Sequence, residues 1–202
     1  MGTKVIRPHG SSRMYGCNGQ HGSSFPHFIA LTAASAFVLA SMLHAQSAPT
    51  EYQVKAAYLY NFAKFVEWPP GVMSSESSFN ICVLGHDPFD PALSTTLAGE
   101  NIKGKNVVVK RISRVQDGVG CQILFISSSE EARLKEILEV LRRESVLTVG
   151  DMPQFTRRGG MIQFVMDANR VRFEVNLTSA ERTGLILSSQ LLKVAIGVRR
   201  NP

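Results

Sequence analysis

The chain has 202 residues, 44% of them hydrophobic and 19% charged, which is typical of a globular protein with one ordinary domain or two small ones. This composition excludes collagen-like, coiled-coil and low-complexity proteins. The 22 Lys and Arg residues outnumber the 16 Asp and Glu residues and give a net charge of +6. Such a charge favours an anionic partner only if the whole chain stays together.

The N-terminal segment has the pattern of an export signal. An uncharged apolar block covers Phe28–Leu43, three basic residues precede it, and the small residue Ala45 follows it. These features predict a signal peptide over residues 1–45 that is cleaved near Ala45, so that no membrane span remains. The alternative is an uncleaved membrane anchor, although the block is shorter than the ~20 residues that span a bilayer comfortably.

Cleavage would change both the net charge and the functional groups of the mature protein. It would remove three basic residues and no acidic ones, leaving 19 basic against 16 acidic residues. Because most of the basic excess belongs to the signal, we expect no nucleic-acid partner. Four of the five His residues would also leave, so that His86 is the only imidazole of the mature protein.

Two cysteines follow the signal, Cys82 and Cys121, 39 positions apart. Disulfides persist in the compartments that receive exported proteins, and we therefore expect these two residues to be bonded. A closed loop of this length stabilises a fold by roughly 4 kcal/mol in the chain-entropy account. The alternative is two separate buried thiols.

The first predicted element of the mature chain is an amphipathic helix over Tyr52–Trp68. Thr50 can cap its start, and Pro69, Pro70 and Gly71 end it. Apolar residues recur at helical spacing at Val54, Tyr58, Phe62, and Phe65 or Val66. Such an aromatic stripe is more often core than binding site.

Short apolar strands then alternate with helical patterns and form two predicted βαβ units. The first consists of Phe79–Gly85, Pro88–Ala98 and Asn106–Ile112, and the second of Gln122–Ile126, Glu130–Arg143 and Ser145–Val149. Strands that are apolar throughout are typical of a parallel sheet covered on both faces.

The pattern changes after Asp151. Met161–Met166 and Val171–Leu177 flank a turn at Asp167–Arg170 and predict a hairpin, and a helix is predicted over Ser188–Ile196. The expected fold class is therefore α/β. Residues 46–202 form one three-layer domain, with a mostly parallel sheet from two βαβ units and a C-terminal antiparallel hairpin.

The segment Asp151–Gly160 is the most irregular part of the chain. We expect a surface loop with one exposed aromatic residue, Phe155, and two arginines, Arg157 and Arg158. Loops on rigid scaffolds often carry function, although solvation is the commoner explanation for a pair of arginines.

No catalytic, metal or cofactor site is predicted. Gly99–Asn106 is close to a phosphate-binding loop, but Asn106 replaces the required hydroxyl and the segment leads from a helix into a strand. A nucleophile would have to use His86 as its base, and the carboxylates Glu174 and Glu181 carry no catalytic signature. We therefore expect a protein that is not an enzyme.

His86 lies beside Asp87 and Asp90, which gives at most a weak metal site. Asp87 is better explained as the N-cap of the following helix.

Five segments in order resemble the YfiR family over about residues 51–196. They are Tyr52–Pro69, Ile81–Gly85, Cys121–Ile126, Arg172–Leu177 and Ser189–Ala195. The resemblance implies a small periplasmic α/β protein without enzymatic activity. The best-understood type in this family represses an inner-membrane diguanylate cyclase by binding its periplasmic domain, and so acts in cyclic di-GMP signalling.

By this resemblance the protein is a periplasmic regulator of an inner-membrane signalling protein, a diguanylate cyclase or a sensor kinase. Formation of a homodimer is an additional hypothesis. Cys82 and Cys121 match the disulfide position shared in the family, whereas the second cysteine pair of some members is absent here.

The candidate partner-binding residues are Tyr60, which lies off the apolar stripe, and Trp68, with Phe155, Arg157 and Arg158 as second choice. An alternative is a periplasmic small-molecule sensor that uses the loops at Gly85–Asp90 and Ser127–Ser129, which a pocket of several hundred Å³ would favour. A thiol-redox protein is a further alternative, although the two cysteines do not form a Cys-x-x-Cys pair.

Overall fold

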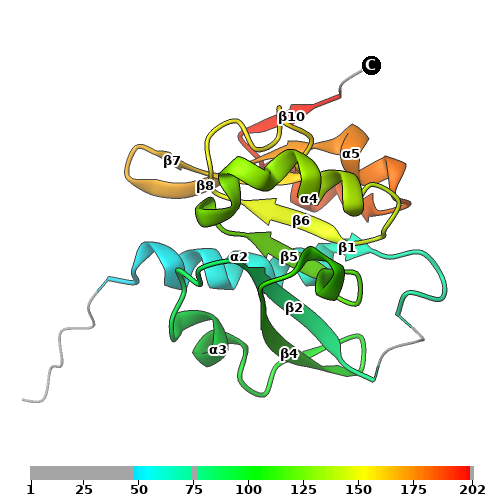
Figure 1. Cartoon of the computed structure of the whole chain (residues 1–202). Helices are drawn as coiled ribbons and strands as arrows, with labels where there is room; N and C mark the ends of the chain where they lie inside the picture. Colours follow the sequence, from blue (N-terminus) through cyan, green and yellow to red (C-terminus); the bar gives the residue numbers. More distant parts are fainter. Residues whose placement is uncertain (1–47, 74–76, 201–202) are drawn as a thin grey trace, which may run out of the picture. The chain divides into compact units, whose positions relative to one another are not determined.

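The computed structural model describes residues 48–73 and 77–200 (Figure 1). Its helices are α2 (Glu51–Phe65), α3 (Ala92–Leu97), α4 (Leu134–Val140), α5 (Leu177–Arg182) and α6 (Ser189–Val194), with 3-10 turns η2 (Val115–Gly118) and η3 (Ser128–Arg133). Its strands are β1 (Val66–Glu67), β2 (Phe79–Leu84), β3 (Asn101–Ile102), β4 (Lys105–Ile112), β5 (Ile123–Ile126), β6 (Leu147–Gly150), β7 (Ile162–Asp167), β8 (Arg170–Asn176), β9 (Ile186–Leu187) and β10 (Gly197–Arg199).

Eight of these strands form one sheet in the order β10-β8-β7-β6-β5-β2-β4-β3. The strands β4, β2, β5, β6 and β7 run parallel to one another, β10 runs parallel to β8, and the edge strand β3 runs antiparallel to β4. The predicted hairpin is the antiparallel pair β7 and β8, in which Asp167 is opposite Arg170. The mostly parallel α/β fold with a late antiparallel hairpin is therefore confirmed.

Each face of the sheet has its own apolar core. On one face, Phe62 of α2 lies with Phe164 and Phe173 of the hairpin. On the other face, Leu134 and Ile137 of α4 lie in a second cluster that contains the strand residue Leu124 and both cysteines. Figure 1 shows α4 and α2 on opposite sides of the sheet. Helices cover both faces, which gives the three expected layers.

The helix α2 begins as predicted and ends earlier. The Thr50 side chain accepts a hydrogen bond from the Gln53 N–H, while the Gln53 side chain accepts one from the Thr50 N–H, so both residues form a capping box. The helix stops at Phe65, not at Trp68, because Val66 pairs with Leu187 in the small sheet of β1 and β9. That sheet was not predicted.

The helices after β2 and β5 are shorter than predicted, and the expected cap at Asp87 is wrong. The Asp87 carboxylate accepts the Phe89 N–H at 2.8 Å and the Arg111 Nε–H at 2.8 Å. It therefore closes a turn several residues before α3 starts at Ala92. Before α4, residues 128–133 form the tighter 3-10 turn η3.

The C-terminal region departs most from the prediction. After β8 the chain forms α5, β9, α6 and β10, where only one helix over Ser188–Ile196 was expected. Ser188 caps α6 by accepting the Leu191 N–H at 3.2 Å. The helix ends at Val194, and residues 197–199 then add the parallel strand β10 beside β8.

The predicted disulfide joins Cys82 of β2 to Cys121, just before β5, and both residues are buried on the α4 face. The signal-peptide prediction concerns residues outside the described part of the chain. Among the described residues, no helix has the length and apolar character needed to cross a membrane.

Replacing both cysteines, Cys82→Ala with Cys121→Ala, should lower the free energy of unfolding by about 4 kcal/mol, because the bond closes a loop of 39 residues that is otherwise free in the unfolded chain. Urea denaturation of the oxidised wild type and the double variant measures this difference. Equal midpoints and slopes would contradict a stabilising role for the bond.

Candidate interaction surface

Tyr60 is half-buried on α2, and its surroundings are polar. Its hydroxyl donates a hydrogen bond to the Glu100 carboxylate, and the Lys64 ammonium lies 3.9 Å from its ring centroid. Part of the ring packs against the core of the α2 face. Tyr60 is therefore partly accessible, but neighbouring groups already satisfy its polar atom.

Trp68 and Phe155 are both buried, so the expectation that Phe155 is an exposed aromatic residue is wrong. Phe155 is 0% exposed and fills the space above two glycines: a Cβ added at Gly150 would lie 2.9 Å from its ring. Trp68 is 8% exposed and packs edge-to-face on Phe79, with ring centroids 5.3 Å apart. Neither side chain offers a partner an exposed surface in this structure.

Arg157 and Arg158 are exposed, as predicted, but they do not adjoin Tyr60. Arg158 donates hydrogen bonds to the Glu131 carboxylate at 3.1 Å and to the Glu131 carbonyl at 2.9 Å. This ties its loop to η3 on the α4 face of the sheet, whereas Tyr60 packs on the α2 face. The structure therefore does not bring the five candidate residues together.

The loops at the ends of β2 and β5 bond to each other. The His86 N–H donates to Ser129 Oγ at 3.0 Å, and a Cβ added at Gly85 would lie 2.8 Å from Glu130 Cγ. The chain of η3 thus occupies the space in which a ligand would lie at these strand ends. In residues 48–73 and 77–200, no group of three or more His, Cys, Asp and Glu residues could hold a metal ion.

A cavity of about 420 Å³ lies beside the outer part of the first of these loops. It is bounded by the start of α2, by residues 88–91 and by α3, and Asp90 is the one charged residue in its lining. Its position partly matches the loop Gly85–Asp90, which the alternative hypothesis of a small-molecule sensor used.

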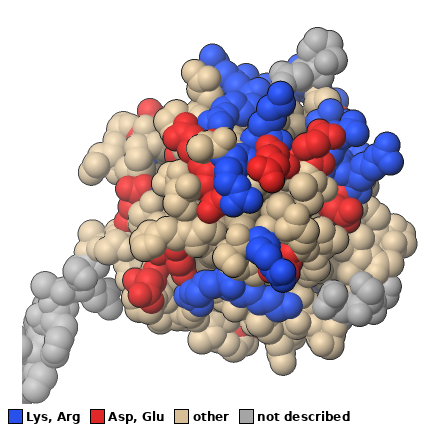
Figure 2. Space-filling model, viewed as in Figure 1, with Lys and Arg blue, Asp and Glu red and all other residues tan. Residues whose placement is uncertain are grey.

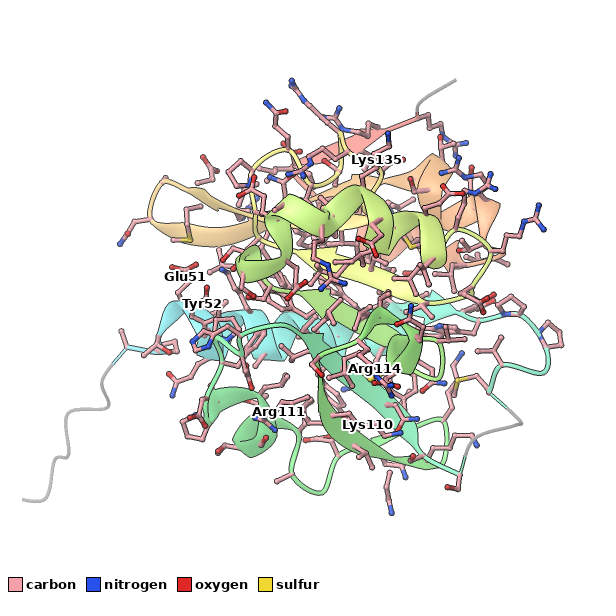
Figure 3. The ribbon with its side chains drawn as sticks, in the orientation of Figure 1. Glu51, Tyr52, Lys110, Arg111, Arg114 and Lys135 are labelled. Atoms are coloured by element: carbon pink, nitrogen blue, oxygen red, sulfur yellow. A yellow bond between two sulfur atoms is a disulfide. The ribbon has the colours of Figure 1, made fainter. Side chains whose placement is uncertain are left out.

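Lys55 is a buried cation that the sequence did not reveal. Its side chain is 4% exposed, and its Nζ lies 2.6 Å from Glu51 Oε1 and 2.6 Å from Asp151 Oδ2. The Tyr52 hydroxyl donates to the same Asp151 oxygen at 3.0 Å. Figure 3 shows Glu51 and Tyr52 together at the start of α2. These contacts fix α2 to the chain that leaves β6.

The surroundings of Lys55 determine its proton affinity. Burial by itself would lower the pKa of the ammonium, but the hydrogen bonds to Asp151 and Glu51 and the attraction of Asp151 outweigh burial and raise this pKa above its ordinary value. Burial, followed by the negative charge of Asp151, raises the pKa of Tyr52 as well. Both groups therefore hold their protons more tightly in the folded protein, which suits an anchor of the fold better than a proton-transfer site.

An apolar groove of about 280 Å³ runs between α2 and α6. Its apolar lining consists of Tyr58, Phe62, Phe65, Phe173, Leu191 and Val194. Two uncharged polar residues, Asn61 and Gln190, complete the lining, which contains no charged residue. We call it the α2–α6 groove.

Exposed apolar side chains continue from this groove along the C-terminal chain. Val194 is 59% exposed, Ile196 43% and Val198 44%, and we call these three residues the C-terminal apolar row. Val198 is in register with Val175, whose side chain lies in the core of the α2 face. Because registered residues of neighbouring strands point to the same side of a sheet, the row and the groove share one face.

This surface was not predicted, because the segment Ser188–Ile196 was assigned to one helix. The residues Val194, Ile196 and Val198 alternate with a period of two, which is the signal of an extended chain. Because that signal overlaps the helical spacing of the preceding residues, the end of the helix at Val194 was not recognised.

Replacing Lys55 tests the buried anchor. Lys55→Met should lower the free energy of unfolding by about 3 kcal/mol at neutral pH, since it leaves Asp151 without its cation. A group whose pKa is raised in the folded protein makes its full contribution to stability at pH values below its ordinary pKa. This ordinary pKa is 10.5 for Lys55 and 10.0 for Tyr52. That contribution is lost as the pH rises through the folded-state pKa, so the gap between wild type and variant should narrow above about pH 10.5.

Urea denaturation across this pH range measures the gap, and Lys110→Met, at an exposed lysine of β4, is the matched control. A gap that does not change with pH, or an equal loss in the control, would contradict the account of Lys55.

Among solved structures, the chain is similar to a conserved domain protein from Vibrio cholerae, with a TM-score of 0.52 and 11% identity over 74% of this chain and 60% of that one. The chain thus spans less than two thirds of that protein. A second similar structure is the ABC domain in complex with L-Trp from Streptococcus pneumoniae, with a TM-score of 0.43 and 10% identity over 63% of this chain and 59% of that one. At this identity the first likeness concerns the fold alone.

The sequence comparison is more specific. The YfiR/HmsC-like family matches residues 52–196, a span that begins in α2 and ends between α6 and β10. It therefore includes the sheet up to β8, the disulfide and the α2–α6 groove. The family is periplasmic, regulatory and non-catalytic. The chain belongs to the YfiR/HmsC-like family.

Proposed function

We propose that the protein is a non-enzymatic periplasmic regulator that binds the periplasmic domain of an inner-membrane signalling protein and represses it. The partner is a diguanylate cyclase or a sensor kinase. The observation that carries the proposal is the apolar surface formed by the α2–α6 groove and the C-terminal apolar row.

This surface has the composition of a protein-binding site. Exposed apolar side chains in a continuous group mark interaction surfaces, and aromatic-lined pockets are where binding energy concentrates. Phe62 and Phe173 form a rigid base for the groove because their rings pack edge-to-face, with centroids 5.0 Å apart. A partner could insert an apolar side chain between α2 and α6 without rearranging the core.

The strand β10 adds a second means of recognition. It is the last strand of the sheet in the described residues, and only β8 pairs with it. An edge strand has unpaired backbone N–H and C=O groups that can pair with an extended segment of another protein. A second copy of the chain could occupy the same surface as a homodimer.

Charge placed in the groove should remove partner binding. Val194→Asp should weaken binding at least about tenfold, because a carboxylate would lose its hydration in an apolar interface. Val119→Asp is the matched control, since Val119 is also exposed, at 43%, but lies near Cys121 and outside the groove lining.

The measurement is capture of inner-membrane proteins from detergent extracts by the purified mature protein and its variants. The wild type and Val119→Asp should retain one membrane signalling protein that Val194→Asp loses. Equal retention by Val194→Asp and the wild type would contradict the assigned surface.

Reduction of the disulfide should leave this binding intact while the protein stays folded. Cys82 and Cys121 lie in the core of the α4 face, whereas the groove lies on the α2 face. The same capture under reducing conditions, at a temperature where circular dichroism shows a folded protein, tests this. Loss of the partner from folded, reduced protein would show that the bond shapes the binding surface.

A second candidate function is small-molecule sensing, which the cavity of about 420 Å³ beside residues 88–91 favours. Its lining is largely uncharged, with Asp90 at one side, and a small polar ligand with a cationic group would suit it. Calorimetric titration with such ligands tests this function. Heats no larger than those of dilution would contradict it.

A further inference from the structure

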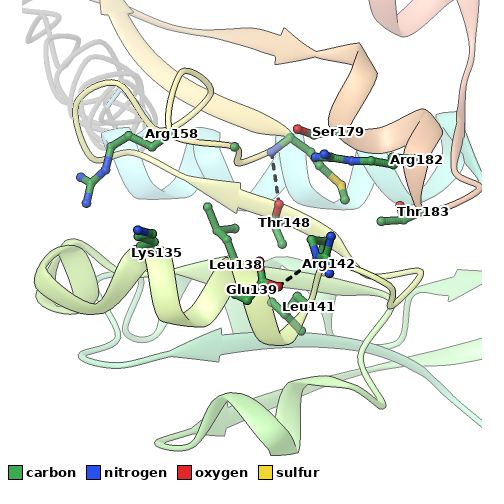
Figure 4. Close-up of a pocket in the computed structure, with 12 residues that line it drawn as sticks. Lys135, Leu138, Glu139, Leu141, Arg142, Thr148, Arg158, Ser179, Arg182 and Thr183 are labelled. Atoms are coloured by element: carbon green, nitrogen blue, oxygen red, sulfur yellow. Dashed lines mark hydrogen bonds and ion pairs between the residues drawn. The ribbon is translucent and has the colours of Figure 1, made fainter. Parts of the chain in front are cut away.

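A third pocket lies on the opposite face of the sheet from the α2–α6 groove (Figure 4). It has a volume of about 220 Å³ and lies between α4, the chain that enters β7, and α5. Four basic residues line it, Lys135, Arg142, Arg158 and Arg182, together with one acidic residue, Glu139. We call it the arginine pocket.

The basic residues are only partly neutralised. Arg142 pairs with Glu139 at 3.0 Å, and Arg158 pairs with Glu131, which lies outside the pocket lining. Within the described part of the chain, neither Lys135 nor Arg182 has an ion-pair partner. Figure 2 shows Lys and Arg, interspersed with Asp and Glu, over the region of α4 and β10. The pocket therefore has a positive field.

The floor of the pocket supplies hydroxyl groups. Thr148 of β6 is buried, and its Oγ1 accepts the Met161 N–H at 3.1 Å, which leaves its O–H able to donate. Ser179 of α5 is also buried and donates its backbone N–H to Asn176 Oδ1 at 3.1 Å. Ser179 also lines the pocket and adds a second hydroxyl-bearing side chain there.

Arg142, Arg182, Thr148 and Ser179 lie at one end of the pocket. Figure 4 shows Arg182 above Thr148 and Arg142 below it in this view, whereas the Arg158 guanidinium points away from them. Arg142 and Arg182 therefore supply the charge nearest to Thr148 and Ser179, whereas Lys135 adds positive charge from the other end of α4. Two planar guanidinium groups can each make paired hydrogen bonds to an oxyanion.

We propose that the arginine pocket binds a phosphate group, either inorganic phosphate or a small phosphate monoester. A phosphate with nearly two negative charges and three or more acceptor oxygens matches several cationic and hydroxyl donors, whereas a monocarboxylate offers one charge and two oxygens. A volume of about 220 Å³ admits the phosphate with a short organic substituent. The site is separate from the α2–α6 groove and does not depend on the proposed partner.

Calorimetric titration with inorganic phosphate and with glycerol phosphate tests the proposal. The protein is purified after export from cells that express the full chain, and the titrations are made at low ionic strength. We expect saturable binding with one site per chain. Tighter binding of glycerol phosphate would identify an esterified ligand, and tighter binding of inorganic phosphate would identify the free ion. Tighter binding of succinate than of both phosphate probes would overturn the assignment.

Variants distinguish a built site from general surface charge. Arg182→Gln should weaken phosphate binding about tenfold, since it removes a charged hydrogen-bond donor, and Ser179→Ala should weaken it about fivefold without changing the charge. Arg143→Gln is the matched control, because Arg143 is exposed and follows Arg142 but does not line the pocket.

The control should change the affinity by no more than about twofold, the effect of a more distant screened charge. Thermal unfolding verifies that each variant is folded. Equal losses in Arg182→Gln and Arg143→Gln, an unchanged affinity in folded Arg182→Gln, or no saturable binding by the wild type would each overturn the proposal.

Discussion

The packing of α2 against one face of the parallel sheet is the constraint on which the rest of the structure depends. Phe62 and Leu59 bury the inner side of this helix against the strands, and Lys55 fixes its first turns to Asp151 at the end of β6. Both Lys55 and the Tyr52 hydroxyl bond to the Asp151 carboxylate, and these two contacts hold the start of α2 beside the end of β6. That position determines where the groove beside α6 opens.

The two faces of the sheet therefore have different chemistry. On the α2 face, aromatic side chains continue outward into an uncharged groove and the exposed C-terminal apolar row. On the α4 face, the helix covers β2 and β5, while polar residues such as Gln163 and Asn176 occupy the later strands and the loop with Phe155 packs over Gly150. A protein partner suits the first face and a small anion suits the second.

Local patterns were sufficient to predict most of the fold. The apolar run Phe79–Gly85 predicted the buried parallel strand, and the alternation in Val171–Leu177 predicted the hairpin. Both predictions were possible because the periodicity of a strand is visible in adjacent residues. The disulfide followed from the predicted export of a chain with two remaining cysteines.

The candidate site was harder to predict because burial depends on distant residues. Phe155 is covered since Gly150 and Gly160 leave room for its ring, and Trp68 is covered by its contact with Phe79. Lys55 can be buried because Asp151, 96 positions later, pairs with it. These contacts join residues that are far apart in the sequence, and no local sequence pattern reveals them. The aromatic and charged residues could therefore not be assigned to surface or core from the sequence.

The most direct test of the account is photo-crosslinking in living cells, with a photoreactive amino acid placed at Val194 or at Val119. The account predicts that position 194 crosslinks to the periplasmic domain of one inner-membrane signalling protein, and that position 119 does not. It also predicts that deletion of the gene raises the output of that partner, which is cyclic di-GMP if the partner is a cyclase. The central claim would be contradicted if position 194 gave no membrane crosslink, or if both positions gave the same products.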